Sequence, residues 1–119
     1  MSVDQIAEIQ PAIREAMEGG PDTCVTFNVG GDPDKWVQFV GRTVNGAYPH
    51  SDDPEARVAD MCSEHLMTKV ISWESGKYAT FLFGEVEATA LAHWVDAYFV
   101  HVLSCGPGGY HVDIACEQI

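Results

Sequence analysis

The sequence predicts an α+β domain whose antiparallel, twisted sheet carries helices mainly on one face, in the order α-β-β-β-α-β-β-α-β. Three observations lead to this prediction. Residues 87–119 combine an amphipathic helix, a glycine stop and a half-buried strand. Residues 68–83 form the clearest β-hairpin pattern in the chain. Helices and strands also fail to alternate regularly, which favours α+β over a parallel α/β sheet.

The first predicted element is a helix that ends at Gly19-Gly20-Pro21, after a capping-box pattern at Ser2 and Gln5. Its apolar residues recur at helical spacing, at Ile6, Ile9, Ile13 and Ala16 or Met17. Pro11 conflicts with this pattern, because an internal proline removes one hydrogen bond and clashes with the preceding turn, at ~3 kcal/mol. We expect one bent helix, with a kink or break near Gln10, that is docked by its isoleucines.

Residues 24–29 alternate as in a strand with one buried side, and residues 30–34 have turn chemistry throughout. The run that follows contains two candidate reversals, Gly41-Arg42 and Asn45-Gly46. Asn-Gly is the stronger hairpin signal, but it leaves only two residues before Pro49. We therefore place the turn near Gly41-Arg42, with strands at about 35–41 and 43–48.

A second helix follows, with Asp53 as its N-cap and Pro54 in its first turn. We expect about three turns with an inner stripe of Val58, Met61, Cys62, His65 and Leu66. The hairpin comes next, as strands 68–74 and 77–83 joined by Ser75-Gly76. A two-residue turn predicts the cross-strand pairs Trp73–Tyr78, Val70–Phe81 and Ile71–Thr80. Large apolar groups then lie on both sheet faces, of which helices cover one and a partner could cover part of the other.

The last helix has one broad apolar face, formed by Leu91, Trp94, Val95, Tyr98, Phe99, Val102 and Leu103. Opposite that face lie His93, Asp96, His101 and Ser104. The closing strand then places Tyr110, Val112, Ile114 and Cys116 on one side and His111, Asp113, Ala115 and Glu117 on the other.

Size and charge restrict the possible functions. At 119 residues the chain is most simply one domain, residues 1–119. Its 18 acidic and 6 basic residues give a net charge of −12, which disfavours direct binding to nucleic acid. No apolar run is long enough to span a bilayer, and residues 1–10 lack the pattern of a secretory signal. We expect a cytoplasmic protein whose four cysteines, Cys24, Cys62, Cys105 and Cys116, are reduced and buried.

No catalytic signature is present, so we expect no enzyme activity, no catalytic residue, no metal and no cofactor. His93 and His101 are eight residues apart on one helix, or ~12 Å, too far to share a metal. Cys105 follows a helix, where the negative end of the dipole raises a thiol pKa. The glycine groups lack the lysine and following helix of a phosphate-binding loop. Only a convergent cluster of His93, His111 and Asp113 would favour an enzyme.

Four stretches resemble the type III secretion chaperone-like fold, including related bacterial domains outside any secretion system. They are KWVQFVG at 35–41, AYP at 47–49, WESGKYATF at 73–81 and LAHWVDAYFVHVL at 91–103. The resemblance covers most of the chain after residue 24. It implies a small, acidic, non-enzymatic protein that holds an extended segment of a partner protein, with a homodimer as one oligomeric state.

Two functional hypotheses follow. The first is a cytoplasmic protein-binding module in which Trp36, Phe39 and Tyr48 form the partner-binding surface, unless they pack in the core. The second is an acidic inhibitor that mimics nucleic acid and blocks a basic binding site. It predicts that acidic groups line one face, among them Asp32/Asp34, Asp52/Asp53/Glu55 and Glu85/Glu87.

Overall fold

A computed structural model describes residues 3–19, 23–29, 32–40, 43–58, 68–83, 87–103 and 112–118. The elements are α1 (Val3–Glu18), β1 (Thr23–Val29), β2 (Asp32–Val40), β3 (Thr43–Ala47), α2 (Pro54–Val58), β4 (Thr68–Glu74), β5 (Tyr78–Phe83), α3 (Ala88–Ala97), η2 (Tyr98–Val102) and β6 (Val112–Gln118). Because the π-helical segment η2 directly continues α3, the order agrees with the predicted α-β-β-β-α-β-β-α-β.

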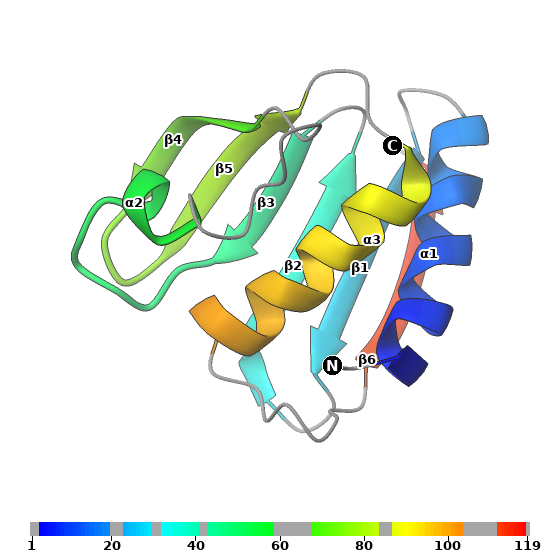
Figure 1. Cartoon of the computed structure of the whole chain (residues 1–119), viewed down its shortest axis with the longest axis horizontal. Coiled ribbons are helices and arrows are strands. Elements are labelled where there is room, and N and C mark those ends of the chain that lie inside the picture. Colours follow the sequence, from blue (N-terminus) through cyan, green and yellow to red (C-terminus); the bar gives the residue numbers. More distant parts are fainter. Residues whose placement is uncertain are drawn as a thin grey trace.

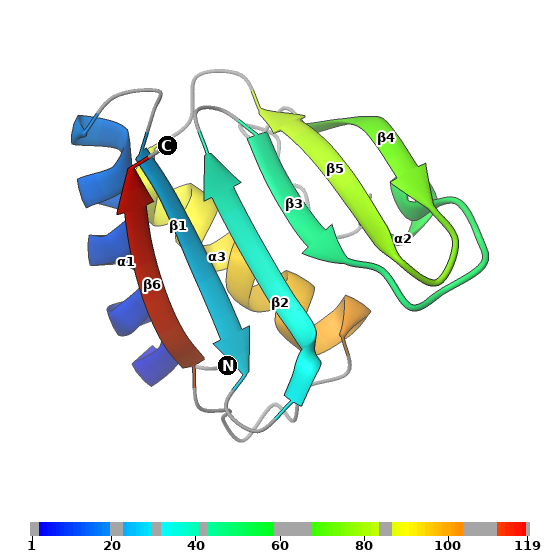
Figure 2. The ribbon, with the colours of Figure 1, turned by 180° about the vertical axis from the view of Figure 1, so that it is seen from behind.

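All the described strands belong to one sheet, in the order β4-β5-β3-β2-β1-β6. Every neighbouring pair is antiparallel. The helices lie in front of the sheet in Figure 1 and behind it in the reversed view of Figure 2, so they share one face. The predicted fold class is confirmed. We call the side that carries the helices the helix face and the opposite side the open face.

The predicted chain reversal between β2 and β3 is confirmed, because Val40 pairs with Thr43, while Gly41 and Arg42 themselves lie outside the described residues. Asn45-Gly46 lies inside β3 instead of forming a turn. Gly46 is required there by packing: a Cβ on it would lie 2.7 Å from ring carbons of the buried Tyr98. The expected turn at 30–34 is wrong in its second half, because β2 begins at Asp32. A register shift lets it pair irregularly with the end of β1.

The β4–β5 hairpin has a different register near its turn from the one predicted. The predicted Val70–Phe81 pair is confirmed. The predicted Trp73–Tyr78 and Ile71–Thr80 pairs are wrong. The structure instead pairs Trp73 with Ala79, Ser72 with Thr80 and Glu74 with Tyr78.

The cause is the turn, which contains three residues instead of two. The backbone N–H of Lys77 donates to the carbonyl of Glu74 at 3.0 Å, and Gly76 adopts a φ of 72°. The extra turn residue shifts the pairing by one position, and a β-bulge at Ile71 restores the register further along β4.

α1 continues through Pro11 as the expected single helix, without the break near Gln10 that we gave as one outcome of the proline. Pro11 lies on the exposed side of the helix, where water can satisfy the carbonyl that loses its partner. Ile9 and Ile13 are 0% exposed. Burying each of them stabilises the docked helix by about 1.5–3 kcal/mol, so the two together match or exceed the ~3 kcal/mol cost of the proline.

The predicted apolar face of the last helix is confirmed, since its seven members are no more than 2% exposed. Trp94 packs edge-on against Phe81 and Phe83 of β5, with ring centroids 5.0 and 4.9 Å apart. The predicted position of Asp96 on the side opposite the apolar face is wrong, because Asp96 is buried. It lies two turns beyond Thr89, which accepts a hydrogen bond from Gln10 of α1, so that flank of α3 faces α1.

β6 is less buried than expected. Val112 is 4% exposed, but Ile114 is 40% exposed and Cys116 is also exposed. The physical reason is position, because β6 is an edge strand with a neighbour only on the β1 side. Cys24 is buried as expected, while Cys62 and Cys105 lie outside the described residues.

Candidate protein-binding surface

Trp36 lies in β2 on the open face, where it is half-buried and packs in part against the hydrophobic core. Val37 and Phe39, the first and third residues after Trp36, are buried on the helix face. Since side chains alternate along a strand, Trp36 points to the opposite side. Its cross-strand partner is Asn28 of β1, and no described helix covers that side of the sheet (Figure 2). A partner could therefore reach Trp36, and its role in binding stays a prediction.

Phe39 and Tyr48 are not exposed, which corrects their expected place on a binding surface. Each is 1% exposed and belongs to the core. Trp36 and Phe39 are three residues apart in one strand, so they cannot share a face. Tyr48 follows β3 and packs edge-on against His50 and Trp73, with ring centroids 5.4 and 6.0 Å apart.

A row of polar side chains crosses the open face, and our sequence reasoning missed it. Gln38 Nε2 donates to Thr26 Oγ1 at 3.3 Å, and Asn45 Nδ2 donates to Gln38 Oε1 at 3.4 Å. Thr80 Oγ1 then donates to Asn45 Oδ1 at 2.6 Å. We call Thr26, Gln38, Asn45 and Thr80 the polar ladder. The sequence shows only that each of these strands has a polar residue at a position that faces outward. Which strands lie side by side, and so which of these residues meet, is decided by the tertiary structure.

Apolar residues flank the polar ladder on both sides. Trp36 and Tyr78 lie toward one side, whereas Val40 and Leu82 lie toward the other. Leu82 is 41% exposed, and the other three are half-buried. None of the eight side chains is charged, so the middle of the open face is uncharged in a chain whose net charge is −12.

A second cluster connects the end of β3 with α2. The Tyr48 hydroxyl donates to the Asp52 carbonyl at 2.6 Å, and Arg57 Nε donates to Asp52 Oδ1 at 2.9 Å. The Arg57 guanidinium lowers the pKa of the Asp52 carboxyl, while burial and the Asp52 charge raise the pKa of Tyr48. Asp53 Oδ1 accepts from Glu55 N at 2.9 Å, which confirms the predicted N-cap. Residues 59–67 lie outside the described residues, so the prediction that α2 has about three turns stays a prediction.

These contacts involve two of the carboxylates that the nucleic-acid-mimic hypothesis names, and the hypothesis stays a prediction. Asp52 is ion-paired with Arg57 and Asp53 caps α2, so both carboxylates have structural roles. Glu85 lies outside the described residues.

The histidines do not gather into a reaction centre within the described part of the chain. His93 and His101 are exposed on the outer side of α3 and η2, whereas Asp113 pairs with Asn28 in the sheet beneath. His50 Nε2 donates to the Val102 carbonyl at 2.8 Å. His65 and His111 are not among the described residues. In the described ranges no three of His, Cys, Asp and Glu lie close enough to hold a metal ion.

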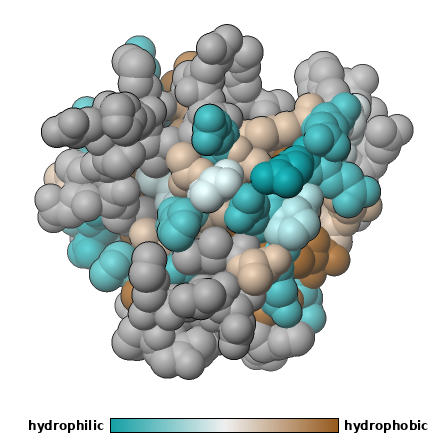
Figure 3. All heavy atoms as spheres, turned by 45° about the vertical axis from the view of Figure 1, so that its right-hand side comes forward, coloured by the Kyte–Doolittle hydropathy of each residue, from teal (hydrophilic) through white to brown (hydrophobic). Residues whose placement is uncertain are grey.

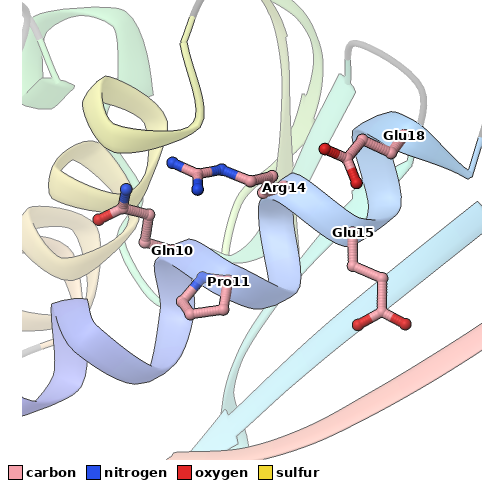
Figure 4. A pocket seen from close by; sticks show the side chains of 5 residues that line it. All are labelled: Gln10, Pro11, Arg14, Glu15 and Glu18. Atoms are coloured by element: carbon pink, nitrogen blue, oxygen red, sulfur yellow. The ribbon is translucent and has the colours of Figure 1, made fainter.

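A surface depression of about 320 Å³ lies along α1 (Figure 4) and is lined by Gln10, Pro11, Arg14, Glu15 and Glu18. Gln10 and Arg14 extend toward α3, and the Gln10 amide already donates to Thr89 at 2.8 Å. Figure 3, which brings this side of the molecule forward, shows mostly hydrophilic described residues with small hydrophobic areas. Because all five lining residues belong to one helix, the depression lacks the apolar, convergent walls of a small-molecule site.

Comparisons of the chain with protein-family models, with curated proteins and with solved structures found no match. The resemblance to type III secretion chaperones therefore stays an expectation. Among the described helices, none is both long and apolar enough to cross a membrane.

Proposed function

We propose that the chain is a non-enzymatic protein-binding module that holds a segment of another protein on the open face of its sheet. One observation carries the proposal: all the described helices lie on the same face, so no described helix covers the other face of the six-stranded sheet. A sheet with one solvated face usually places polar residues there. Here that face instead combines the polar ladder with Trp36, Tyr78, Val40 and Leu82.

This combination suits a polypeptide ligand. Tryptophan and tyrosine are enriched among the residues that dominate protein interfaces, where they bury a large apolar area and still offer a polar atom. The amide and hydroxyl groups of the polar ladder could exchange hydrogen bonds with a peptide backbone. The absence of charge among these residues favours a partner segment that is itself uncharged where it crosses the sheet. The resemblance to type III secretion chaperones supports the same conclusion, since those proteins hold extended segments of their partners.

The test is capture of a partner by the immobilised full chain, followed by binding measurements with the purified partner. Trp36→Ala should lose capture and leave the melting temperature close to that of the parent chain. Trp73→Ala is the matched control, because Trp73 is 37% exposed but shares the face of the buried Ala79. Hydrogen exchange in the complex should show protection of β2, β3 and β5.

Leu82→Glu is the second variant, since Leu82 is exposed on the open face and its replacement leaves the core intact. It should weaken binding even if Trp36→Ala destabilises the fold. Capture that survives both open-face substitutions, or that is lost equally with Trp73→Ala, contradicts the proposal.

A further inference from the structure

Two aromatic side chains on the open face lie in one row across the strands. Val37 of β2 pairs with Gly46 of β3. The preceding residue of β2, Trp36, therefore lies beside Ala47, which pairs in turn with Tyr78 of β5. Ala47 shares the open face with both rings, because its neighbour Gly46 faces the helices. We call Trp36 and Tyr78 the aromatic platform; Figure 2 views the sheet from this side.

The small residue between the two rings is buried. Although Ala47 lies on the open face, it is only 4% exposed. The described side chains that flank its methyl group on that face are those of Trp36 and Tyr78, which accounts for its burial. Both rings are themselves half-buried, so each keeps part of its surface for a ligand. The aromatic platform is therefore a pair of accessible rings with a filled floor between them.

The spacing of the aromatic platform matches one backbone conformation. Trp36 and Tyr78 are two strands apart, at ~4.8 Å per strand, which gives ~9.6 Å. A polyproline II helix repeats every three residues with a rise of ~3.1 Å each, or ~9.3 Å. Neighbouring side chains on one face are instead ~6.7 Å apart in a β-strand and ~5–6 Å apart in an α-helix. A polyproline II segment that runs across the strands can therefore place residues i and i+3 on the two rings.

The polar ladder supplies hydrogen-bond donors for such a segment. It runs parallel to the aromatic platform, one same-face step of ~6.7 Å along the strands. Gln38 and Asn45 each have two amide N–H groups and use one of them within the polar ladder, which leaves one donor on each. The indole N–H of Trp36 is a further donor. A polyproline II backbone has no internal hydrogen bonds and a proline has no N–H, so the segment presents mainly acceptors to these donors.

We propose that the segment held on the open face is uncharged, rich in proline and in polyproline II conformation, with prolines at i and i+3 on Trp36 and Tyr78. This inference rests on the proposed function and gives the chemistry of its partner. Charge agrees with it, because the middle of the open face is uncharged, whereas Lys69, Glu74 and Asp113 lie on the edge strands. A proline-rich segment also loses little freedom on binding, since its rings fix φ beforehand.

The test titrates peptides into the isotope-labelled full chain and follows NMR signals. Deca-proline, and a decapeptide with prolines at every third position and glutamines between them, should shift the Trp36 indole signal and the side-chain amide signals of Gln38 and Asn45 to saturation. A decapeptide with prolines at every second position should bind roughly tenfold more weakly. Tyr78→Ala and Trp36→Ala should each raise the dissociation constant for deca-proline roughly tenfold, through loss of one stacked ring.

Trp73→Ala is the control, because Trp73 lies on the helix face, and it should leave peptide binding unchanged. Trp36→Phe keeps a ring at the position and should bind between the parent chain and Trp36→Ala, so the test holds even if the alanine variant unfolds. Circular dichroism checks the fold of each variant.

The outcomes separate this inference from the proposed function. Absence of saturable shifts with deca-proline overturns the inference, and so does equal binding of the peptide with prolines at every second position or equal loss in Trp73→Ala. If a captured protein protects β2, β3 and β5 through a segment without prolines three residues apart, the proposed function stands and this inference falls. If neither a proline peptide nor a captured protein protects these strands, both fall.

Discussion

Gly46 provides the sharpest test of the packing between β3 and the closing helix. In Gly46→Ala the new Cβ would lie 2.7 Å from Cε1 and Cζ of Tyr98. Tyr98 cannot move into solvent, because it is 0% exposed and its hydroxyl donates to the Ala47 carbonyl at 2.8 Å. Either the ring or the strand must shift, and the hydrogen bond to Ala47 lengthens.

The expected net effect is destabilisation by about 2 kcal/mol. Overpacking of a core costs ~1–3 kcal/mol. Disturbing the buried hydrogen bond of Tyr98 adds ~1 kcal/mol. Replacing a strand glycine returns ~0.5–1 kcal/mol, because the unfolded chain loses conformational freedom. For a chain of 119 residues the net value corresponds to a fall in melting temperature of roughly 8 °C.

Urea and thermal unfolding followed by circular dichroism measure this effect. Gly76 is the comparison, because no atom lies within 4 Å of a Cβ built there and only its φ of +72° disfavours a side chain. Gly76→Asn should therefore be tolerated, whereas Gly46→Asn should be worse than Gly46→Ala. In a Tyr98→Leu background, Gly46→Ala should cost much less. A neutral Gly46→Ala, or an equal cost in both backgrounds, would refute the packing explanation.

The remaining predictions concern the start of α2. Asp53→Ala should destabilise the chain by ~1 kcal/mol through loss of the N-cap bond to Glu55, and Asp53→Ser should retain most of the stability; equal unfolding curves for the two variants would contradict this. Arg57 lowers the pKa of Asp52 below its usual 3.8, so this ion pair stabilises the fold above pH 3.8, and its contribution is lost as the pH falls through the lowered pKa. In Arg57→Gln an NMR titration should show the pKa of Asp52 rising, and an unchanged value would exclude the ion pair as the cause.

Residue patterns alone were sufficient for the element order and for the buried side of α1, of β1 and of the last helix. The last helix shows this best, because its seven apolar residues recur at helical spacing and every one is buried. The Asp53 cap and the reversal between Val40 and Thr43 were also predictable. These features depend on neighbours within a few residues, where backbone geometry and side-chain period leave few choices.

Contacts between distant segments decided the rest. Asn45-Gly46 became strand because β3 pairs with β2 on one side and with β5 on the other. Asp96 became buried because α1 lies beside α3. Ile114 and Cys116 are exposed because β6 is the last strand of the sheet. Trp36, Phe39 and Tyr48 could be recognised as large apolar strand residues, but only the pairing of β2 with its neighbours shows that Trp36 alone faces outward. A local pattern predicts which residues of a strand share one side of that strand. Which side is covered depends on where the rest of the chain packs.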